Sequence, residues 1–217
     1  MDIREALYTT RSMRRVKPDP IEPDAQARIL DAAIRAPSGG NAQNWRFLLV
    51  DDPALRAQLG PLYRECRDEL WTGVYKPRLD AAAADPEADE SIQFLKIKRS
   101  ADWMADNFEI YPLLMFAFAQ HDPSGGSIYP AIWSAQLAAR ADGIGSSLTV
   151  MLAFRQAQVY EILGVPEDEG WNMAGCVPFG YPTGRWGVAQ RRPAHEVAHR
   201  NQWGAPLGLT IDEPLYP

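Results

Sequence analysis

Apolar residues recur at helical spacing in six stretches of the chain, and short continuous apolar runs separate them. The helical stretches lie at 2–10, 22–36, 53–63, 92–104, 129–141 and 156–163. The apolar runs that we expect to form strands lie at 47–50, 111–118, 148–152 and 171–177. Short, nearly all-apolar runs are typical of strands buried on both faces. The pattern therefore predicts helices packed against a buried sheet.

Two stretches lack this periodicity. Between 73 and 90 a Tyr-Lys-Pro turn, an alanine run and an acidic cluster replace it. Long irregular segments in a compact chain are often lids, so we expect 73–90 to be a lid over a pocket or a plain surface loop. The second stretch is the tail, 201–217, which is rich in proline and glycine. A tail that cannot bury itself either dangles or wraps a partner.

The composition narrows the class of protein. The chain has 217 residues, of which 46% are hydrophobic and 23% charged, and no linker divides it. We therefore predict one domain over 1–217. No apolar stretch is long enough to span a membrane, and the N-terminus lacks the apolar core of a signal peptide. We expect a cytoplasmic protein without membrane contact.

The formal charge of −6 and the two cysteines argue against a nucleic-acid-binding protein, a disulfide-stabilised protein and a cysteine metal site. No long basic tract with interleaved aromatic residues is present, which argues against nucleic acid as a partner. Cys66 and Cys176 stand far apart without C-x-x-C spacing. Neither a disulfide framework nor a cysteine metal site is indicated, and both thiols are expected to be buried or incidental.

A polar loop joins the second helix to the first strand. It runs from Ala36 to Phe47 and reads A-P-S-G-G-N-A-Q-N-W-R-F. The adjacent glycines let the backbone approach another group closely, and the Ser, Asn and Gln side chains supply donors and acceptors. An ordinary helix-to-strand connection has a similar composition, so the loop alone does not decide between the two.

Two basic clusters lie near opposite ends of the chain. The first is Arg11-Ser12-Met13-Arg14-Arg15, after the first helix, and the second is Arg191-Arg192-Pro193. A guanidinium group can bind two oxygens of one phosphate at once, and it keeps its charge at any physiological pH. These clusters therefore suit a phosphate monoester. Alone, each cluster is equally typical of a solvated surface. A fold that joins them would create a local anion site on an acidic protein.

In this order and spacing, the motifs resemble those of the nitroreductase family of FMN-dependent flavoproteins. The shared elements are R-S-x-R after the first helix, A-P-S-x-x-N-x-Q-x-W before the first strand, G-I-G-S after a late helix, G-Y-P, R-R-P and a terminal N-x-W-G. No single motif is decisive, but the collinear combination covers nearly the whole chain.

The resemblance implies an α+β fold with a mainly antiparallel sheet flanked by helices. It also implies an intertwined homodimer with FMN at the interface, in which the tail 201–217 wraps the other subunit. The cofactor-binding residues implied near the phosphate are Arg11, Ser12, Met13, Arg14 and Arg191, with Arg15 and Arg192 as neighbours. Those implied near the flavin are Pro37, Ser38, Gly39, Asn41 and Gln43, in this family usually from the partner subunit.

Two further points concern the flavin contacts. Gly145 and Ser146 are candidate contacts to the ring, although a glycine is also expected wherever a helix ends. Gly40 and Asn44 depart from the commoner loop of the family, which often has serine or threonine and then proline. This departure puts the side-chain contacts of the loop in doubt more than the site itself.

The chemistry implied by the resemblance is a two-step redox exchange. NADH or NADPH would reduce the flavin and leave, and a nitroaromatic or quinone-like acceptor would then take two electrons, which is ping-pong kinetics. No side chain is expected to act as a covalent catalyst. A non-catalytic FMN-binding protein is one alternative. Family members that dehalogenate aromatic rings or break down flavin are others.

The segment His195-Glu196-Val197-Ala198-His199 matches H-E-x-x-H, which in zinc hydrolases places two histidines one helical turn apart. A catalytic zinc needs a third protein ligand, and no histidine follows His199. Glu213 is an acidic alternative downstream, in the unpatterned tail. A zinc-dependent hydrolase is therefore the second functional class, although the flavoprotein resemblance already accounts for this segment.

Overall fold

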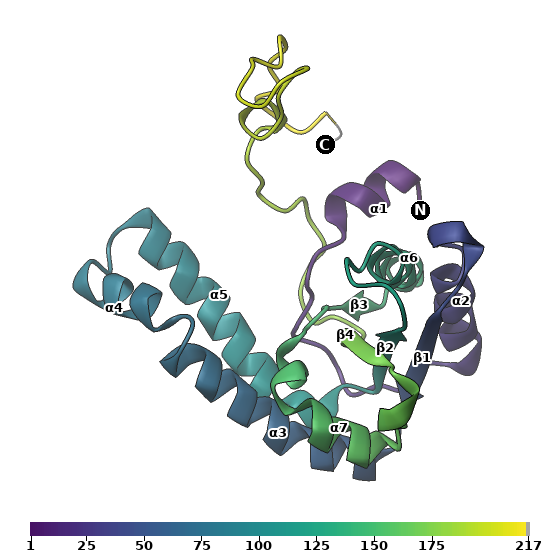
Figure 1. Ribbon diagram of the computed structural model, residues 1–217. Coiled ribbons are helices and arrows are strands. Elements are labelled where there is room, and N and C mark those ends of the chain that lie inside the picture. The colour runs from purple at the N-terminus through teal and green to yellow at the C-terminus, as the bar shows by residue number, and fades with distance from the viewer. Residues whose placement is uncertain (216–217) are drawn as a thin grey trace. The chain divides into compact units, whose positions relative to one another are not determined.

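A four-stranded antiparallel sheet lies at the centre of the fold, with helices on both faces (Figure 1). The computed structural model describes residues 1–215. The strand order is β1-β2-β4-β3. The strands are β1 (Trp45–Val50), β2 (Leu113–Ala119), β3 (Gly145–Ser146) and β4 (Asn172–Gly180). The α+β class and the antiparallel sheet predicted from the sequence are confirmed.

The described chain contains seven α-helices. They are α1 (Ile3–Thr9), α2 (Pro23–Ala33), α3 (Pro53–Thr72), α4 (Lys76–Ala84), α5 (Asp89–Asp106), α6 (Ile128–Ala141) and α7 (Gln156–Leu163). Capping side chains and prolines explain several boundaries. Asp2 accepts a hydrogen bond from the Arg4 amide at the start of α1, and Asp52 accepts one from the Ala54 amide at the start of α3. Pro23 opens α2 at the position where its missing N–H costs nothing.

The two faces of β2 belong to two separate hydrophobic cores. All seven residues of β2 are buried. Leu113, Met115 and Ala117 pack in the core that contains α2 and α6. Leu114 and Phe116 pack in the core that contains α3, α5 and α7. Burying each large apolar side chain contributes about 1.5–3 kcal/mol, so β2 holds both helical layers to one sheet.

The hairpin formed by the end of α3, α4 and the start of α5 has a small core of its own. Trp71, Ala82 and Phe94 are buried there, with Tyr75 and Leu79 packed against them. Figure 1 shows this hairpin extending away from the sheet. The expectation of an irregular segment over 73–90 is wrong in this respect, because α4 covers half of it. An alanine run carries no apolar period, although alanine has the highest helix propensity.

One predicted strand is absent. We expected 148–152 to continue the sheet, but β3 spans only Gly145–Ser146, and Met151–Arg155 forms a 3-10 turn. Thr149 still makes an isolated bridge to Cys176. Within this run only Leu152 is fully buried, in the core that contains α3 and α7, whereas Val150 is 53% exposed.

The chain divides into two compact units. One contains Met1–Arg11 and Arg185–Pro217, and the other contains Ser12–Gly184, with the sheet and helices α2 to α7. Within the described part of the tail, 201–215, no helix or strand forms, and 216–217 lie outside the described residues. The wrapping role of the tail stays a prediction, as does the single domain.

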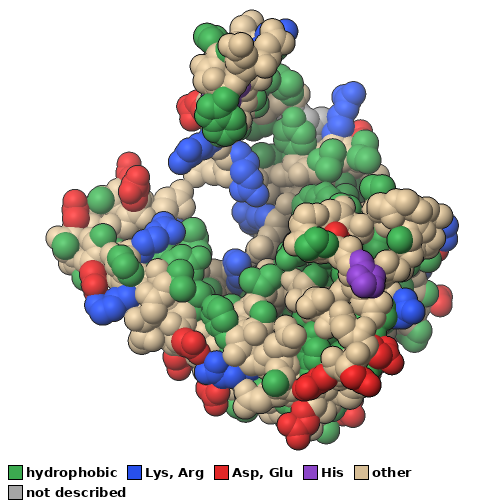
Figure 2. All heavy atoms as spheres, in the orientation of Figure 1, with side chains coloured by type: hydrophobic (Ala, Val, Ile, Leu, Met, Phe, Trp, Pro, Cys, Tyr) green, Lys and Arg blue, Asp and Glu red, His purple; other side chains and the backbone are tan. Residues whose placement is uncertain are grey.

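Acidic side chains gather over α7 and the turn that follows it (Figure 2). The turn carries Glu167, Asp168 and Glu169, all exposed.

No helix in the described part of the chain is both long and apolar enough to cross a membrane.

Candidate flavin site

The segment after Arg11 lies against β3, so two predicted motifs meet in the fold. Ser12 forms a β-bridge with Ser146, and the Met13 amide donates a hydrogen bond of 2.9 Å to the Ser146 carbonyl. Gly145 permits this approach, because a Cβ there would lie 2.8 Å from Cβ of Met13. The R-S-M-R and G-I-G-S segments are thus adjacent in space although 130 residues separate them in sequence.

The backbone of Arg14 and Arg15 is fixed by residues from other elements. The hydroxyl of Tyr111 donates a hydrogen bond to the Arg14 carbonyl. The Arg15 carbonyl accepts bonds from the amide and the hydroxyl of Thr183, at 3.0 and 3.3 Å. Tyr111 is fully buried, and burial raises the pKa of its hydroxyl. It therefore stays a neutral donor at any physiological pH.

The side chains of Arg14 and Arg15 have no acidic partner in the described chain. Arg14 is partly buried and Arg15 is exposed, and the guanidinium of Arg15 lies 5.8 Å from the ring centroid of Trp103 on α5. Most other arginines of this unit pair with a carboxylate or a carbonyl, as Arg67 does with Asp106 and Arg56 with Tyr111. Two cations on a fixed backbone, with no ion-pair partner among the described residues, make this segment a candidate anion site.

The hydroxyl of Ser146 is buried and held by α6. The side-chain amide of Gln136 donates to Oγ of Ser146 at 3.1 Å, and both residues are at least 90% buried. Next to it, the hydroxyl of Ser147 is buried without a hydrogen-bond partner among the described residues. A buried hydroxyl that lacks a partner costs free energy unless something else bonds it, so this segment has capacity for a further polar contact.

The loop between α2 and β1 is braced by its own side chains. Oγ of Ser38 accepts from the Gln43 amide at 3.2 Å, and the side chain of Gln43 donates to Oδ1 of Asn41 at 3.1 Å. Asn41 and Gln43 have positive φ angles of 53° and 51°, as does Gly40 at 57°. Such conformations cost side-chain-bearing residues about 1 kcal/mol or more and cluster at functional sites. The sequence patterns did not predict this strain.

The same loop borders a hollow of about 360 Å³ in the sheet-containing unit. Besides Ser38, Gly39 and Gln43, the loop 120–127 lines it, and Oγ of Ser127 accepts a hydrogen bond from the Gly39 amide. The arginines of the R-S-M-R-R segment do not line this hollow. This hollow therefore does not join the polar loop to the arginine segment of the same chain.

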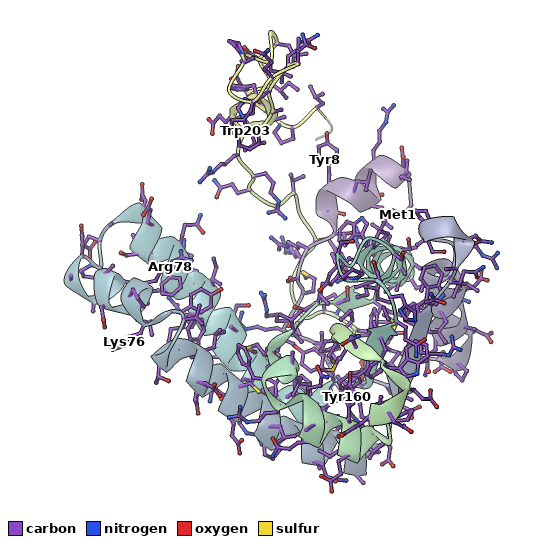
Figure 3. All side chains as sticks on the ribbon, viewed as in Figure 1. Met1, Tyr8, Lys76, Arg78, Tyr160 and Trp203 are labelled. Atoms are coloured by element: carbon purple, nitrogen blue, oxygen red, sulfur yellow. The ribbon has the colours of Figure 1, made fainter. Side chains whose placement is uncertain are left out.

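The remaining predicted phosphate residues lie in the other unit. Arg11 donates to the Arg185 carbonyl at 2.9 Å, and Arg191 donates to the Gln190 carbonyl at the same distance. Arg191 and Arg192 line a hollow of about 590 Å³ that also includes Tyr8 of α1 (Figure 3) and the acidic side chains Asp212 and Glu213. The two predicted arginines of this unit are thus exposed at its surface.

The H-E-x-x-H segment does not form the arrangement that a catalytic zinc requires. Only a three-residue 3-10 turn, Ala194–Glu196, covers its start, so its histidines do not share an α-helical face. Nδ1 of His195 contacts the backbone of Ile211, and His199 packs beside Trp203 with ring centroids 5.1 Å apart. No group of three metal-binding side chains occurs among residues 1–215. The zinc-hydrolase alternative is therefore wrong.

Of the aromatic residues that could stack against a planar acceptor, several belong to hydrophobic cores. Phe108 is fully buried and stacks on Tyr63, and Trp71 is 8% exposed in the hairpin core. Trp103 differs from these because its ring is partly exposed beside Arg15. Of the aromatic residues considered, it is the one whose ring faces a predicted site residue.

Residues 7–181 match the model of the Nitroreductase family. The chain belongs to this family. Among similar proteins, an NADH dehydrogenase of Thermus thermophilus is 29% identical over 198 residues, covering 91% of this chain and 95% of that protein. A 5,6-dimethylbenzimidazole synthase of Rhodobacter capsulatus is 27% identical over 194 residues, covering 83% of each. These relatives have different activities, so the family does not determine the acceptor.

This nitroreductase-family chain also shares its fold with solved structures. An iodotyrosine deiodinase bound to FMN and 3-iodo-L-tyrosine superposes with a TM-score of 0.69 at 23% identity. The match covers 88% of this chain and 95% of that structure. At this identity the similarity establishes the fold alone.

Two side chains that hydrogen-bond to site residues, Gln136 and Tyr111, were not predicted to do so from the sequence. Gln136 is a polar residue on the apolar face of the predicted helix 129–141. A polar side chain on such a face indicates a buried hydrogen bond, so the sequence contained this information. The bond from Tyr111 to Arg14 had no signal, because it joins residues 97 positions apart. Tyrosine in an apolar run is equally typical of the core.

Proposed function

We propose that the chain is an FMN-dependent oxidoreductase that uses NADH or NADPH to reduce nitroaromatic or quinone-like acceptors. The observation that carries this proposal is the fixed segment Ser12–Arg15, which presents two unpaired arginines beside the buried Gly145–Ser146 turn. Family membership, an FMN-bound structure of the same fold and a relative named for NADH oxidation support it.

The residues present fit an FMN phosphate and the polar edge of its ring. Ser12 and the guanidinium of Arg14 offer donors to phosphate oxygens, and the family pattern adds Arg11 and Arg191 as candidate ligands. The unpartnered hydroxyl of Ser147 offers a donor beside Ser146. When bound, FMN supplies the two-electron chemistry that links NAD(P)H to the acceptor. The protein's contribution is to hold the cofactor, orient its ring and limit access to it.

We further propose that the active form is a homodimer in which Pro37, Ser38, Gly39, Asn41 and Gln43 approach the flavin of the other subunit. The separation of this loop from the arginine segment within one chain supports the arrangement, because one chain then does not complete the site. The strain at Asn41 and Gln43 is consistent with a loop shaped to meet a ligand.

The visible absorbance spectrum of the purified protein tests the proposal. We expect a flavin spectrum that bleaches on anaerobic addition of NADH or NADPH and returns on addition of a nitroaromatic. A protein that retains FMN but is not reduced by either nucleotide would be a non-catalytic flavin carrier. A colourless protein that fails to bind added FMN would overturn the proposal.

A further inference from the structure

One side of α5 carries exposed cations that form no ion pair among the described residues. Lys96, Arg99 and Trp103 follow each other at spacings of three and four residues, so they share one side of the helix. Lys96 and Arg99 are exposed, and the partly exposed ring of Trp103 lies 5.8 Å from the guanidinium of Arg15. We name Lys96, Arg99, Trp103 and Arg15 the cationic face.

The acidic residues nearest to this face along α5 are already paired elsewhere. Asp102 accepts from Lys98 at 2.6 Å and from the indole of Trp71 at 2.8 Å. Asp106 pairs with Arg67 of α3 at 2.7 Å. Among the described residues, no carboxylate forms an ion pair with Lys96, Arg99 or Arg15. Like charges three residues apart on a helix are destabilising by a few tenths of a kcal/mol, and a bound anion would relieve that repulsion.

The position of the face ties it to the proposed site. Arg15 directly follows Arg14, and its carbonyl is fixed by Thr183. In Figure 1, α5 runs from the tip of the hairpin towards the sheet, so the face extends from the arginine segment along the hairpin. The partly exposed indole of Trp103 offers a flat apolar surface between the cations, on which a planar ring can stack.

We infer that the cationic face binds the anionic group of a planar acceptor, so that this enzyme prefers aromatic acceptors carrying a carboxylate over neutral ones of the same shape. The inference rests on the proposed function, and it names the substrate class of that site. The carboxylate pairs with Arg99 and Lys96, while the ring lies near Trp103 and Arg15. The 2′-phosphate of NADPH has the same charge chemistry, and the experiment separates the two sources.

The test compares 4-nitrobenzoate with 4-nitrobenzamide, which have similar shapes and differ in charge. The FMN-loaded protein is reduced with NADH, freed of excess nucleotide without oxygen, and mixed with each acceptor while flavin reoxidation is followed. We expect Lys96→Gln and Arg99→Gln each to lower the second-order rate constant for 4-nitrobenzoate by about three- to five-fold. The rate constant for 4-nitrobenzamide should stay unchanged.

Lys98→Gln is the matched control, because it removes the same charge from the same helix on the side that faces α3 and the hairpin core. It should leave the ratio of the two rate constants unchanged. Ionic strength gives a second comparison. Raising it from about 0.01 to about 0.15 M shortens the Debye length from about 30 to about 8 Å, and this should slow the benzoate reaction selectively.

A binding measurement avoids turnover. 4-Chlorobenzoate carries the charge without a reducible nitro group, and its affinity for the oxidised protein can be read from perturbation of the flavin absorbance. We expect Arg99→Gln to raise the dissociation constant of 4-chlorobenzoate. The factor should equal the one by which the same substitution lowers the rate constant for 4-nitrobenzoate.

The outcomes separate the inference from the proposed function. If neither acceptor reoxidises the reduced protein, the proposed function fails. If both acceptors reoxidise the reduced protein, the proposed function stands. If the double variant Lys96→Gln, Arg99→Gln then keeps the wild-type ratio of the rate constants for 4-nitrobenzoate and 4-nitrobenzamide, the inference is overturned. If the double variant instead loses a preference for NADPH over NADH with the neutral acceptor, the inference is overturned too, and the cations serve the nucleotide phosphate.

Discussion

At the scale of single residues, the candidate site depends on hydrogen bonds from buried side chains of other elements. Tyr111 fixes the carbonyl of Arg14, and Gln136 fixes the hydroxyl of Ser146. Both donors are buried, so neither loses its partner to competing water. The arginines can be recognised in the sequence from charge alone. The backbone that carries them is held by Tyr111, which charge does not reveal.

The first prediction concerns Tyr111→Phe. Loss of the bond to the Arg14 carbonyl should lower the free energy of unfolding by about 1 kcal/mol and weaken FMN retention, because the arginine segment loses an anchor. Urea unfolding and an FMN titration measure the two effects. Tyr160→Phe is the control, since the Tyr160 hydroxyl also bridges two backbone groups, at Trp171 and Met173, away from the arginines (Figure 3). Equal FMN affinity in both variants would exclude an anchoring role for Tyr111.

The bond between Gln136 and Ser146 gives a second prediction. Gln136→Leu leaves the buried Ser146 hydroxyl without its donor and should cost about 1–3 kcal/mol of unfolding free energy. Adding Ser146→Ala should recover part of that loss, because no buried group is then left unpaired. A double-mutant cycle by urea denaturation measures the coupling. Strictly additive effects would show that the two side chains do not interact in solution.

The buried thiol of Cys176 predicts a loss of stability at alkaline pH. Burial raises the pKa of this thiol well above its usual value, whereas the unfolded chain ionises it near pH 8.5. The folded state then holds a proton that the unfolded state releases, so stability falls as pH rises above about 8.5, by up to about 1.4 kcal/mol per pH unit.

Cys176→Ala should reduce this slope between about pH 9 and 10 in urea unfolding. Cys66→Ala serves as the comparison. The pKa of Cys66 is also raised by burial, but Arg155 opposes the shift, so its removal should change the slope less. A slope unaffected by Cys176→Ala would mean that this thiol ionises equally in both states.

At the scale of elements, hydrophobic periodicity predicted most helices and three of the four strands. α7 has the bounds expected from its pattern, and the three longer strands lie where apolar runs predicted them. The failures have physical causes. In the apolar run at 148–152, Leu152 is buried by packing without a strand, and periodicity cannot distinguish such packing from strand pairing. α4 lacks an apolar stripe, because alanine dominates it.

The hairpin core predicts that α4 opens independently of the sheet. Phe94→Ala removes the ring that packs against Trp71 and lies under the guanidinium of Arg78. Because the hairpin core contains so few buried side chains, we expect faster amide hydrogen exchange over 74–92 and unchanged exchange in β2. Hydrogen-exchange mass spectrometry measures both segments in one sample.

Phe118→Ala is the counterpart in the sheet, where Phe118 packs edge-on against Tyr160. Its loss should accelerate exchange in the sheet as well as in α7. If Phe94→Ala accelerates exchange equally in both regions, the hairpin and the sheet unfold as one unit, and the hairpin does not move on its own.

At the scale of the whole molecule, the order of motifs predicted the family and the fold, but it did not show how the motifs are distributed. Ser12, Met13, Gly145 and Ser146 meet in one unit, which the family pattern implied. Contacts between distant segments determine where the chain divides into two units, at Arg11 and Arg185. They also determine the positive φ angles of Asn41 and Gln43. Local pattern carries no information about such contacts, and the family pattern does not specify the acceptor either.

The last prediction concerns the homodimer. Tyr129 and Trp133 lie one turn apart on α6 and are 42% and 39% exposed, although most other large apolar residues of this helix are buried. Exposed neighbouring aromatic residues mark interfaces, and Trp is enriched among residues that dominate binding energy. Trp133→Glu should therefore shift the protein towards monomer in light scattering and lower its FMN content, because each site would lose the loop of the other subunit. Val74→Glu, at an apolar side chain 71% exposed beside α4, is the matched control and should keep the dimer. A monomeric Trp133→Glu protein that retains full FMN would show that one chain completes the site, and an unchanged dimer would place the interface elsewhere.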